Sequence, residues 1–282
     1  MKTTITIAEW LARAAKALRP TSETPLLEAQ ALLAHFTGLT RVYILTHPEH
    51  RLDDATLQQL DGALERLCQG EPLPYVLGEQ EFYGLPFKVT PAVLIPRPET
   101  ELLVEQAIVW LNHHPERRLA ADVGTGSGCI AISLAHHIPD LIVLAVDRSR
   151  PALEVARENL RRLRLSQRVH LLQADLLSPI NASFDVICAN LPYIPTARLA
   201  ELKVAQHEPH TALDGGPAGL DLIQRLLEQA PYRLAPGGLL LAELDASQAL
   251  TLPEIARRYF PQAQITLHSD PAGLPRLLAI QT

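Results

Sequence analysis

Between residues 99 and 282, short β-prone segments alternate with helical segments, and no other feature limits the possible folds as strongly. Strands separated by helices of about 10 to 15 residues form βαβ units and a mostly parallel, doubly wound α/β sheet. The last two strands are separated only by residues 270–273, which predicts an antiparallel hairpin and therefore seven strands of which one is reversed. The predicted strands are 119–123, 142–146, 169–173, 184–189, 238–243, 265–268 and 277–280, and the predicted helices are 99–111, 129–137, 150–163, 220–234 and 247–259.

The first 70 residues predict a small helical bundle instead. Thr6 and Glu9 have the spacing of a capping box, in which each side chain accepts a hydrogen bond from the other residue's backbone N–H. Thr24 is the expected N-cap of a second helix that ends at Gly38, and a third helix is expected from about residue 53 to residue 70.

Residues 71–98 separate these two regions. Six prolines in this segment exclude a long helix, and short β-prone pieces remain at 81–83 and 87–89, divided by Gly84. We therefore predict a hairpin-like connector at 71–98, between an N-terminal helical domain at 1–70 and an α/β domain at 99–282.

Composition narrows the class of protein. The 282 residues carry a net charge of −6, which argues against a generally basic surface that grips duplex nucleic acid. The three cysteines lie far apart and form no CxxC pair, so neither a zinc site nor a disulfide framework is indicated. The first residues lack the apolar core of a signal peptide, and no apolar run approaches the roughly 20 residues of a membrane helix. These features predict a cytoplasmic protein without a membrane span.

A glycine-rich turn joins the predicted strand 119–123 to the predicted helix 129–137. Its residues, Gly124-Thr125-Gly126-Ser127-Gly128, form GxGxG rather than the GxGxxG of dinucleotide-binding proteins, and no Lys-Ser/Thr pair follows as in a P-loop. A strand, a tight glycine turn and a helix N-terminus bind nucleotide-like ligands at the carboxyl ends of parallel strands. Such turns also serve helix–sheet packing, so the turn alone does not decide between the two uses.

Two acidic residues follow the next strands. Asp147 comes at the end of the second predicted strand, where a carboxylate can accept both hydroxyl groups of an adenosyl ribose. Asp175 follows the third strand, where it can lie beside an adenine edge. The alternative is that both residues cap helices or lie in loops. Because the turn lacks the pyrophosphate fingerprint, the pattern favours an adenosyl compound such as S-adenosylmethionine.

The fourth predicted strand runs into Asn190-Leu191-Pro192-Tyr193, beside the glycine turn. An amide NH2 group is a poor nucleophile because its lone pair is delocalised. The Asn190 side-chain oxygen and a main-chain carbonyl near Leu191 and Pro192 could accept its two hydrogens. Tyr193 could stack on the planar group and stabilise positive charge, while Pro192 stiffens the backbone that positions it. Asn190, Pro192 and Tyr193 are therefore the predicted catalytic residues. The alternative is an Asn turn with a packed tyrosine.

Together with other motifs along nearly the whole chain, these residues resemble the HemK-type (PrmC) family of S-adenosylmethionine-dependent methyltransferases. This family modifies the glutamine of the Gly-Gly-Gln motif in bacterial class 1 peptide-chain release factors. The most specific segments are residues 95–101, Ile-Pro-Arg-Pro-Glu-Thr-Glu, and residues 208–221, with Glu208-Pro209, Gly215-Gly216 and Gly219-Leu220-Asp221.

The resemblance implies a class I methyltransferase-like domain, N5-methylglutamine as product, and an N-terminal domain that docks the release factor. It implies cofactor contacts from Gly124 to Gly128, with Asp147 at the ribose, Asp175 and Leu176 near adenine, and Asn190 at the methionine side. It also implies that the glutamine amide is received by Asn190, Leu191, Pro192 and Tyr193.

Two positions depart from the family pattern. Leu191 stands where the family usually has proline, and Asp245 stands where glycine is usual after Glu243. Asn-Leu-Pro-Tyr also occurs in ribosomal RNA adenine dimethyltransferases. Three alternatives therefore remain: an adenine-N6 methyltransferase of RNA or DNA, an N5-glutamine methyltransferase of a ribosomal protein, and a non-enzymatic adaptor whose cofactor pocket only stabilises it. The two His-His pairs, 113–114 and 136–137, lie near helix ends and are interpreted as surface residues, so no metal site is predicted.

Overall fold

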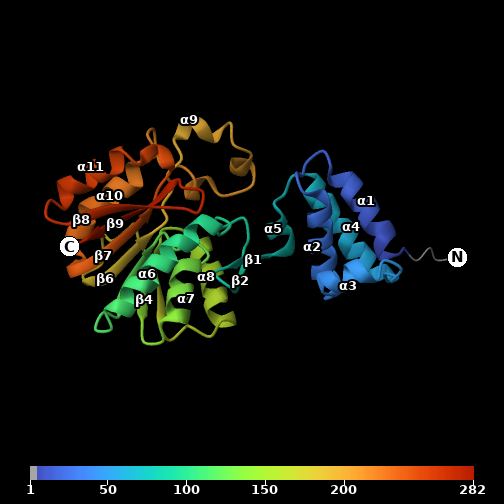
Figure 1. Ribbon diagram of the computed structural model, residues 1–282, viewed down its shortest axis with the longest axis horizontal. Helices are drawn as coiled ribbons and strands as arrows, with labels where there is room; N and C mark the ends of the chain where they lie inside the picture. The colour runs from blue at the N-terminus through green and yellow to red at the C-terminus, as the bar shows by residue number, and fades with distance from the viewer. Residues whose placement is uncertain (1–4) are drawn as a thin grey trace. The chain divides into compact units, whose positions relative to one another are not determined.

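The computed structural model describes residues 5–282, and the predictions that include residues 1–4 lie outside the described residues at those four positions. The chain divides between Glu79 and Gln80 into two compact units, whose helices and strands are labelled in Figure 1. The predicted connector is shared between them, because the short helix α5 (Leu73–Leu77) belongs to the first unit and most of the hairpin belongs to the second.

The first unit is a helical bundle, as predicted. The capping box is confirmed, since Thr6 accepts from the Glu9 N–H and the Glu9 carboxylate accepts from the Thr6 N–H. The second helix ends at Gly38 in the left-handed conformation and begins after Thr24 at the N-cap position, both as predicted, although the Thr24 side chain makes no capping hydrogen bond. The helices that precede α5 in this unit are α1 (Ile7–Leu18), α2 (Pro25–Thr37), α3 (Arg41–Thr46) and α4 (Asp54–Cys68).

Trp10 lies at the centre of the bundle. It is fully buried with Ile7, Leu33 and Leu60 around it in the same apolar cluster, and its indole N–H donates to Asp61 over 3.1 Å. The indole group therefore buries its ring while keeping its one donor satisfied. The sequence did not predict α3 or α5, because five or six residues are too few to establish a helical period.

A two-stranded hairpin, β1 (Glu79–Phe82) and β2 (Leu85–Lys88), follows. The predicted strands at 81–83 and 87–89 exist but are displaced, since Tyr83 has a φ of 50° and belongs to the turn. The Tyr83 N–H donates to the Glu101 carboxylate over 2.8 Å. Glu101 therefore holds this turn in addition to placing negative charge at a helix N-terminus.

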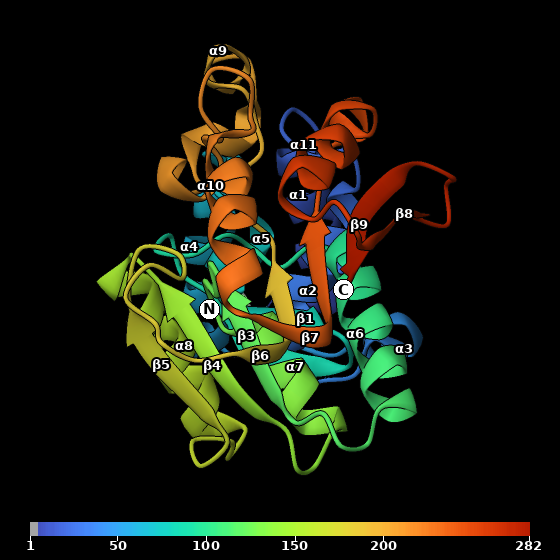
Figure 2. The same ribbon diagram turned by 90° about the vertical axis from the view of Figure 1, so that its left-hand side faces the viewer.

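The second unit contains the predicted seven-stranded sheet, in the order β5-β4-β3-β6-β7-β9-β8 (Figure 2). Neighbouring strands are parallel except where β9 pairs with β7 and with β8, which confirms one reversed strand and the final hairpin. Because β3 lies between β4 and β6, the carboxyl ends of these three strands meet at the switch point where such sheets bind ligands. The strands are β3 (Leu119–Val123), β4 (Ile142–Asp147), β5 (Val169–Gln173), β6 (Phe184–Ala189), β7 (Leu234–Glu243), β8 (Gln264–Ser269) and β9 (Pro275–Gln281).

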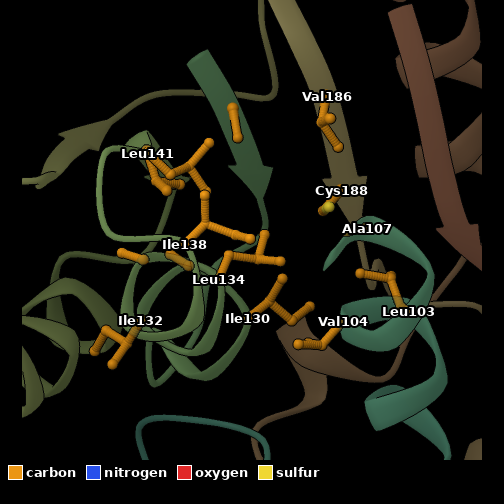
Figure 3. Close-up of a cluster of buried hydrophobic side chains, with 14 of the residues drawn as sticks. Leu103, Val104, Ala107, Ile130, Ile132, Leu134, Ile138, Leu141, Val186 and Cys188 are labelled. Carbon is orange, nitrogen blue, oxygen red and sulfur yellow. The ribbon is translucent and has the colours of Figure 1, made fainter. Parts of the chain in front are cut away.

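Helices cover both faces of this sheet. Along β6, Val186 and Cys188 face the apolar cluster that includes α6, α7 and α8, whereas Ile187 and Ala189 face the cluster that includes α10 and α11. Figure 3 shows the first cluster, with Val186 and Cys188 directed toward side chains of α6 and α7. This period of two is what a strand buried on both faces requires. The helices are α6 (Glu101–His113), α7 (Cys129–His137), α8 (Arg150–Arg162), α10 (Asp221–Gln229) and α11 (Thr251–Tyr259).

Three predicted helix boundaries are wrong. The helix predicted at 99–111 begins with a 3-10 turn, Pro98–Thr100, before α6, and the helix predicted at 247–259 has a 3-10 turn, Ala246–Gln248, before α11. The helix predicted at 220–234 ends early, because β7 already begins at Leu234. The short helix α9 (Thr196–Leu199) and the 3-10 turns in the loop after β6 were not predicted.

No helix in residues 5–282 is long and apolar enough to cross a membrane. The cysteines Cys68, Cys129 and Cys188 are free. Cys129 and Cys188 are buried in the sheet's core, and burial raises the pKa of both thiols.

Candidate active site

A pocket opens at the carboxyl ends of β3, β4 and β6. It is lined by every predicted cofactor residue except Gly128, and by Leu191 and Pro192. Gly128 instead begins α7 and packs closely against α8, where an added Cβ would lie 3.3 Å from Cβ of Ala156. Tyr193 is not among the lining residues.

Backbone hydrogen bonds hold the glycine turn, residues 124–128, against β4. The N–H groups of Gly124 and Thr125 both donate to the Val146 carbonyl, over 2.8 and 2.9 Å. The Asp147 carboxylate accepts from the N–H groups of Gly126 and Ser149, over 2.9 and 2.8 Å. Burial raises the pKa of Asp147, yet each of its oxygens keeps a lone pair that a ligand hydroxyl could use.

Two buried polar side chains, those of Asp122 and Asn159, form hydrogen bonds to the turn. Asp122 accepts from the Thr125 hydroxyl over 2.5 Å and from the Ala131 N–H over 3.1 Å, and burial raises the pKa of Asp122 to about 7. Asn159 of α8 donates to the Ser127 carbonyl over 2.9 Å and exchanges two hydrogen bonds with the backbone of Lys88 in β2. Asn159 thus fixes the distance between the turn and the hairpin.

The predicted adenine region lies at the end of β5. Asp175 is exposed and forms an ion pair with Arg225 of α10 over 2.5 Å. Leu176 is buried and adopts a left-handed φ of 53°, a conformation that is uncommon for residues other than glycine. Both residues line the pocket.

The tetrapeptide, residues 190–193, is held by side chains from distant segments. The Asn190 amide nitrogen, Nδ2, donates to the Thr100 hydroxyl over 2.9 Å, and that hydroxyl donates to the Glu243 carboxylate over 2.6 Å. The Tyr193 hydroxyl donates to the other oxygen of the same carboxylate over 3.3 Å. Thr100 and Glu243 are buried, and burial raises the pKa of Glu243 to about 7. Burial, followed by the charge of Glu243, also raises the pKa of Tyr193.

The glycine-rich segment at 215–221 packs against the backbone of the tetrapeptide. A Cβ at Gly219 would overlap the Tyr193 carbonyl oxygen, and one at Gly215 would lie 2.7 Å from the Pro192 carbonyl oxygen. The buried Gln248 amide donates to the carbonyls of Tyr193 and Gly219, over 3.2 and 2.8 Å. Only glycine permits this approach of two backbones.

An ion pair between the half-buried Arg97 and the buried Glu208 joins the two segments on which the family resemblance depends most. The Glu208 carboxylate pairs with Arg97 and accepts from the Ile95 N–H over 3.0 Å. Arg97 lines the pocket, as do Leu94 and Pro96 before it. Segment 94–97 is therefore a wall of the pocket that is anchored to the loop after β6.

Two family models match this chain. The PrmC N-terminal domain matches residues 9–78, and the methyltransferase small domain matches residues 99–207. A release factor glutamine methyltransferase of Moorella thermoacetica is 45% identical over 256 residues, 90% of each chain. One of Koribacter versatilis is 42% identical over 259 residues, again 90% of each chain. The chain belongs to the release factor glutamine methyltransferase family. This confirms the resemblance inferred from the sequence motifs.

Solved structures agree with the fold of this release factor glutamine methyltransferase family member. A ribosomal RNA methyltransferase of T. thermophilus, solved with AdoMet and guanosine, is 19% identical with a TM-score of 0.54, covering 72% of this chain and 49% of that chain. At that identity the likeness concerns the fold, and it confirms the class I methyltransferase architecture.

Sequence reasoning missed Thr100, Glu243 and Gln248, whose side chains hold the tetrapeptide of this family member. Thr100 was passed over because it lies between Glu99 and Glu101, whose charges suit a helix N-terminus. Glu243 could have been predicted as a site residue, because it is a charged residue that directly follows the apolar run 239–242. A parallel strand neighbouring β6 brings that end to the same edge of the sheet as Asn190.

Proposed function

We propose that this enzyme transfers the methyl group of S-adenosylmethionine to the side-chain amide nitrogen of the glutamine in the Gly-Gly-Gln motif of class 1 peptide-chain release factors. The observation that carries the proposal is the pocket itself, which the glycine turn and the Asn190 amide border together. Membership of the family supports the substrate, and the methyltransferase neighbour solved with AdoMet supports the cofactor.

The residues present fit that cofactor. A Cβ at Gly126 would meet no atom within 4 Å, so the turn faces open space that a ligand could fill. We assign the ribose hydroxyls to Asp147, the adenine to the Asp175–Leu176 corner, and the methionine end to Asn190 and residues 124–128. When bound, S-adenosylmethionine supplies a methyl group activated by its sulfonium sulfur, and S-adenosylhomocysteine is the product.

The tetrapeptide is proposed to receive the glutamine amide. Because the Asn190 Nδ2 atom already donates to Thr100, the side-chain oxygen is the atom left to accept one amide hydrogen. The carbonyls of Pro192 and Tyr193 face Gly215 and Gln248, so we assign the second acceptor to the Leu191 carbonyl. Two such hydrogen bonds let the nitrogen become pyramidal toward the methyl carbon, and it releases a proton once the new C–N bond has formed. We propose that the ring of Tyr193 stacks on the amide.

Transfer of a labelled methyl group tests the function. Wild-type protein is expected to label a purified class 1 release factor and to leave unlabelled the same factor with its motif glutamine changed to alanine. Parallel reactions contain ribosomal proteins, ribosomal RNA and DNA. Equal labelling of the altered factor contradicts the proposed site, and labelling of RNA, DNA or a ribosomal protein alone supports the corresponding alternative enzyme. Cofactor binding without transfer to any acceptor supports the adaptor. A cytoplasmic location and the lack of stable nucleic-acid binding stay predictions.

We propose further that the N-terminal unit docks the release factor. Large apolar side chains are exposed on it at Leu26 and Leu27 of α2 and at Val42 and Leu45 of α3, two helices that contact each other, and an apolar patch formed by such residues would mark a protein interaction site. Val42→Lys is expected to raise the KM for the release factor several-fold, with kcat and cofactor affinity retained. Leu250→Lys, at a site that is 85% exposed in the other unit, is the control. An unchanged KM for Val42→Lys contradicts docking at α3.

A further inference from the structure

Three segments that are far apart in the sequence meet in one chain of hydrogen bonds behind the tetrapeptide. Thr100 lies 90 residues before Asn190 and 143 residues before Glu243, and the links between these side chains measure 2.9 and 2.6 Å. Thr100 is 2% exposed and Glu243 is 6% exposed. Water therefore has little access to replace either partner.

The order of donors and acceptors along this chain determines which way the Asn190 amide faces. An ionised carboxylate only accepts, so the single hydroxyl proton of Thr100 goes to Glu243. The hydroxyl oxygen is then left to accept, and it can accept only from the NH2 end of Asn190. With the amide turned over, two acceptor oxygens would face each other, which costs the free energy of a buried unsatisfied group.

We propose that Thr100 and Glu243 are positioning residues for methyl transfer, because they hold the Asn190 side-chain oxygen toward the acceptor nitrogen. The inference rests on the proposed function and deepens it. Asn190 touches the glutamine in this proposal. Thr100 reaches the edge of the pocket with little exposed area, and Glu243 lies outside the lining, so both are assigned an effect through Asn190. Glu243 also receives the Tyr193 hydroxyl on its second oxygen, so a single carboxylate orients both the amide and the ring of the tetrapeptide.

Protonation of Glu243 would disturb the order of donors and acceptors from Asn190 through Thr100 to Glu243. A neutral carboxyl group carries a proton of its own, which competes with Asn190 for the Thr100 oxygen. Burial raises the pKa of Glu243 most, the hydrogen bonds from Thr100 and Tyr193 lower it, the charge of Glu99 raises it and that of Arg276 lowers it, and together they bring this pKa to about 7. Arg276 is itself paired with Asp270, while Asp245 and Cys129 are the other titratable groups coupled to Tyr193 or Glu243. Loss of kcat is therefore expected as the pH falls through about 7.

The test compares Thr100→Val, which removes the hydroxyl at nearly constant shape, with Thr100→Ser, which keeps it. Removing a hydrogen bond to a charged group costs about 1.5–3 kcal/mol, so kcat with a release factor should fall about ten- to a hundredfold in Thr100→Val. Thr100→Ser should keep most of kcat. The KM for the factor and the cofactor Kd should change less than about threefold in both, as binding surfaces stay intact. Glu243→Gln should lower kcat and abolish the fall between pH 8 and pH 6.

Wild-type kcat in Thr100→Val overturns the inference, as does an equal loss in Thr100→Val and Thr100→Ser, which indicates a purely structural role. A wild-type enzyme that labels no release factor overturns the proposed function instead. The hydrogen-bond order is then still decided by NMR, with the Asn190 side-chain amide signal assigned from Asn190→Asp. Its protons should exchange slowly with water in the wild type and rapidly in Thr100→Val, and should respond to pH near 7. Fast exchange in the wild type overturns the inference, and this measurement needs no methyl acceptor.

Discussion

The glycine turn and the tetrapeptide border the same pocket, yet different kinds of contact hold them. The turn is fixed by hydrogen bonds of its own strand–turn–helix unit and of the β4–α8 segment that follows it, chiefly to Val146, Asp147 and Asn159. The tetrapeptide depends on side chains that reach it from Thr100, Glu243 and Gln248. The part proposed to bind the cofactor is thus local in sequence, whereas the part proposed to act on the amide is assembled across the whole sheet.

The largest effect is expected at the tetrapeptide. Asn190→Ala removes the oxygen proposed to hold the acceptor nitrogen, and loss of a comparable preorganised contact lowers kcat about a hundred- to a thousandfold. Asn190 is also assigned to the methionine end of the cofactor, so the cofactor Kd measured by calorimetry should rise, but by much less than kcat falls, because residues 124–128 and Asp147 are held independently. Residual activity equal to that of the wild type contradicts the role of Asn190. A parallel loss of cofactor affinity contradicts the independence of the two halves.

A second prediction concerns a place where the turn lies close to the tetrapeptide. Gly124 has a φ of 79°, and a Cβ there would lie 2.9 Å from Cδ2 of Leu191, whereas Gly126, with a φ of 55°, has open space above it. Left-handed strain costs about 1–2 kcal/mol in either alanine variant, so both should weaken cofactor binding about tenfold. Only Gly124→Ala should also lower kcat, because Leu191 must move with the tetrapeptide.

The double variant Gly124→Ala/Leu191→Ala is the control for that contact. Truncating Leu191 removes the methyl group in the way of the new Cβ, so part of the lost kcat should return while the loss of cofactor affinity remains. No recovery in the double variant contradicts the steric link. An equal fall of kcat in Gly126→Ala contradicts it as well.

The difference between contacts that are local in sequence and contacts between distant segments also decides what could be predicted from the sequence. The seven strands, the reversed β9 and the glycine turn follow from local periodicity and from the spacing of turn residues, and they are confirmed. Thr100 and Glu243 were missed because a hydrogen bond between residues 143 positions apart leaves no local pattern. The helical turns at 196–212 were missed for a related reason, since small contacts such as Leu213 with Leu199 stabilise them and no amphipathic period does.

A third prediction separates activity from stability at Glu243. Its pKa is raised above the value of an unfolded chain, so the folded state favours the neutral carboxyl, and ionisation as the pH rises from about 4.5 to about 7 lowers the free energy of unfolding. Glu243→Gln should remove this contribution, and its free energy of unfolding should fall less steeply over that window than that of the wild type. Asp122, whose pKa burial raises to about 7, titrates in the same range, so part of the pH dependence of the free energy of unfolding remains in both proteins.

Denaturant unfolding at several pH values measures this difference, and subtraction of the two curves cancels the groups they share. The activity of the wild type is expected to rise at the upper end of the pH range in which its stability falls, because Glu243 of the folded protein ionises near pH 7 and the ionised carboxylate orders Thr100 and Asn190. A steeper fall in Glu243→Gln than in the wild type contradicts the raised pKa. Such a result would mean that the ionised Glu243 carboxylate stabilises the folded state. The inference holds instead that its ionisation lowers the free energy of unfolding and serves to orient Thr100 and Asn190.

The smallest effect is expected at the ion pair of Arg225 with Asp175, at the adenine end. The two side chains are 44% and 54% exposed, and exposed ion pairs contribute about 0–1 kcal/mol, so Arg225→Ala should change the free energy of unfolding by less than about 1 kcal/mol. Cofactor affinity should change less in Arg225→Ala than in Asp175→Asn if the carboxylate itself contacts the ligand. A loss of about 2 kcal/mol or more in Arg225→Ala contradicts the comparison. The adenine end would then depend, like the tetrapeptide, on a partner 50 residues away.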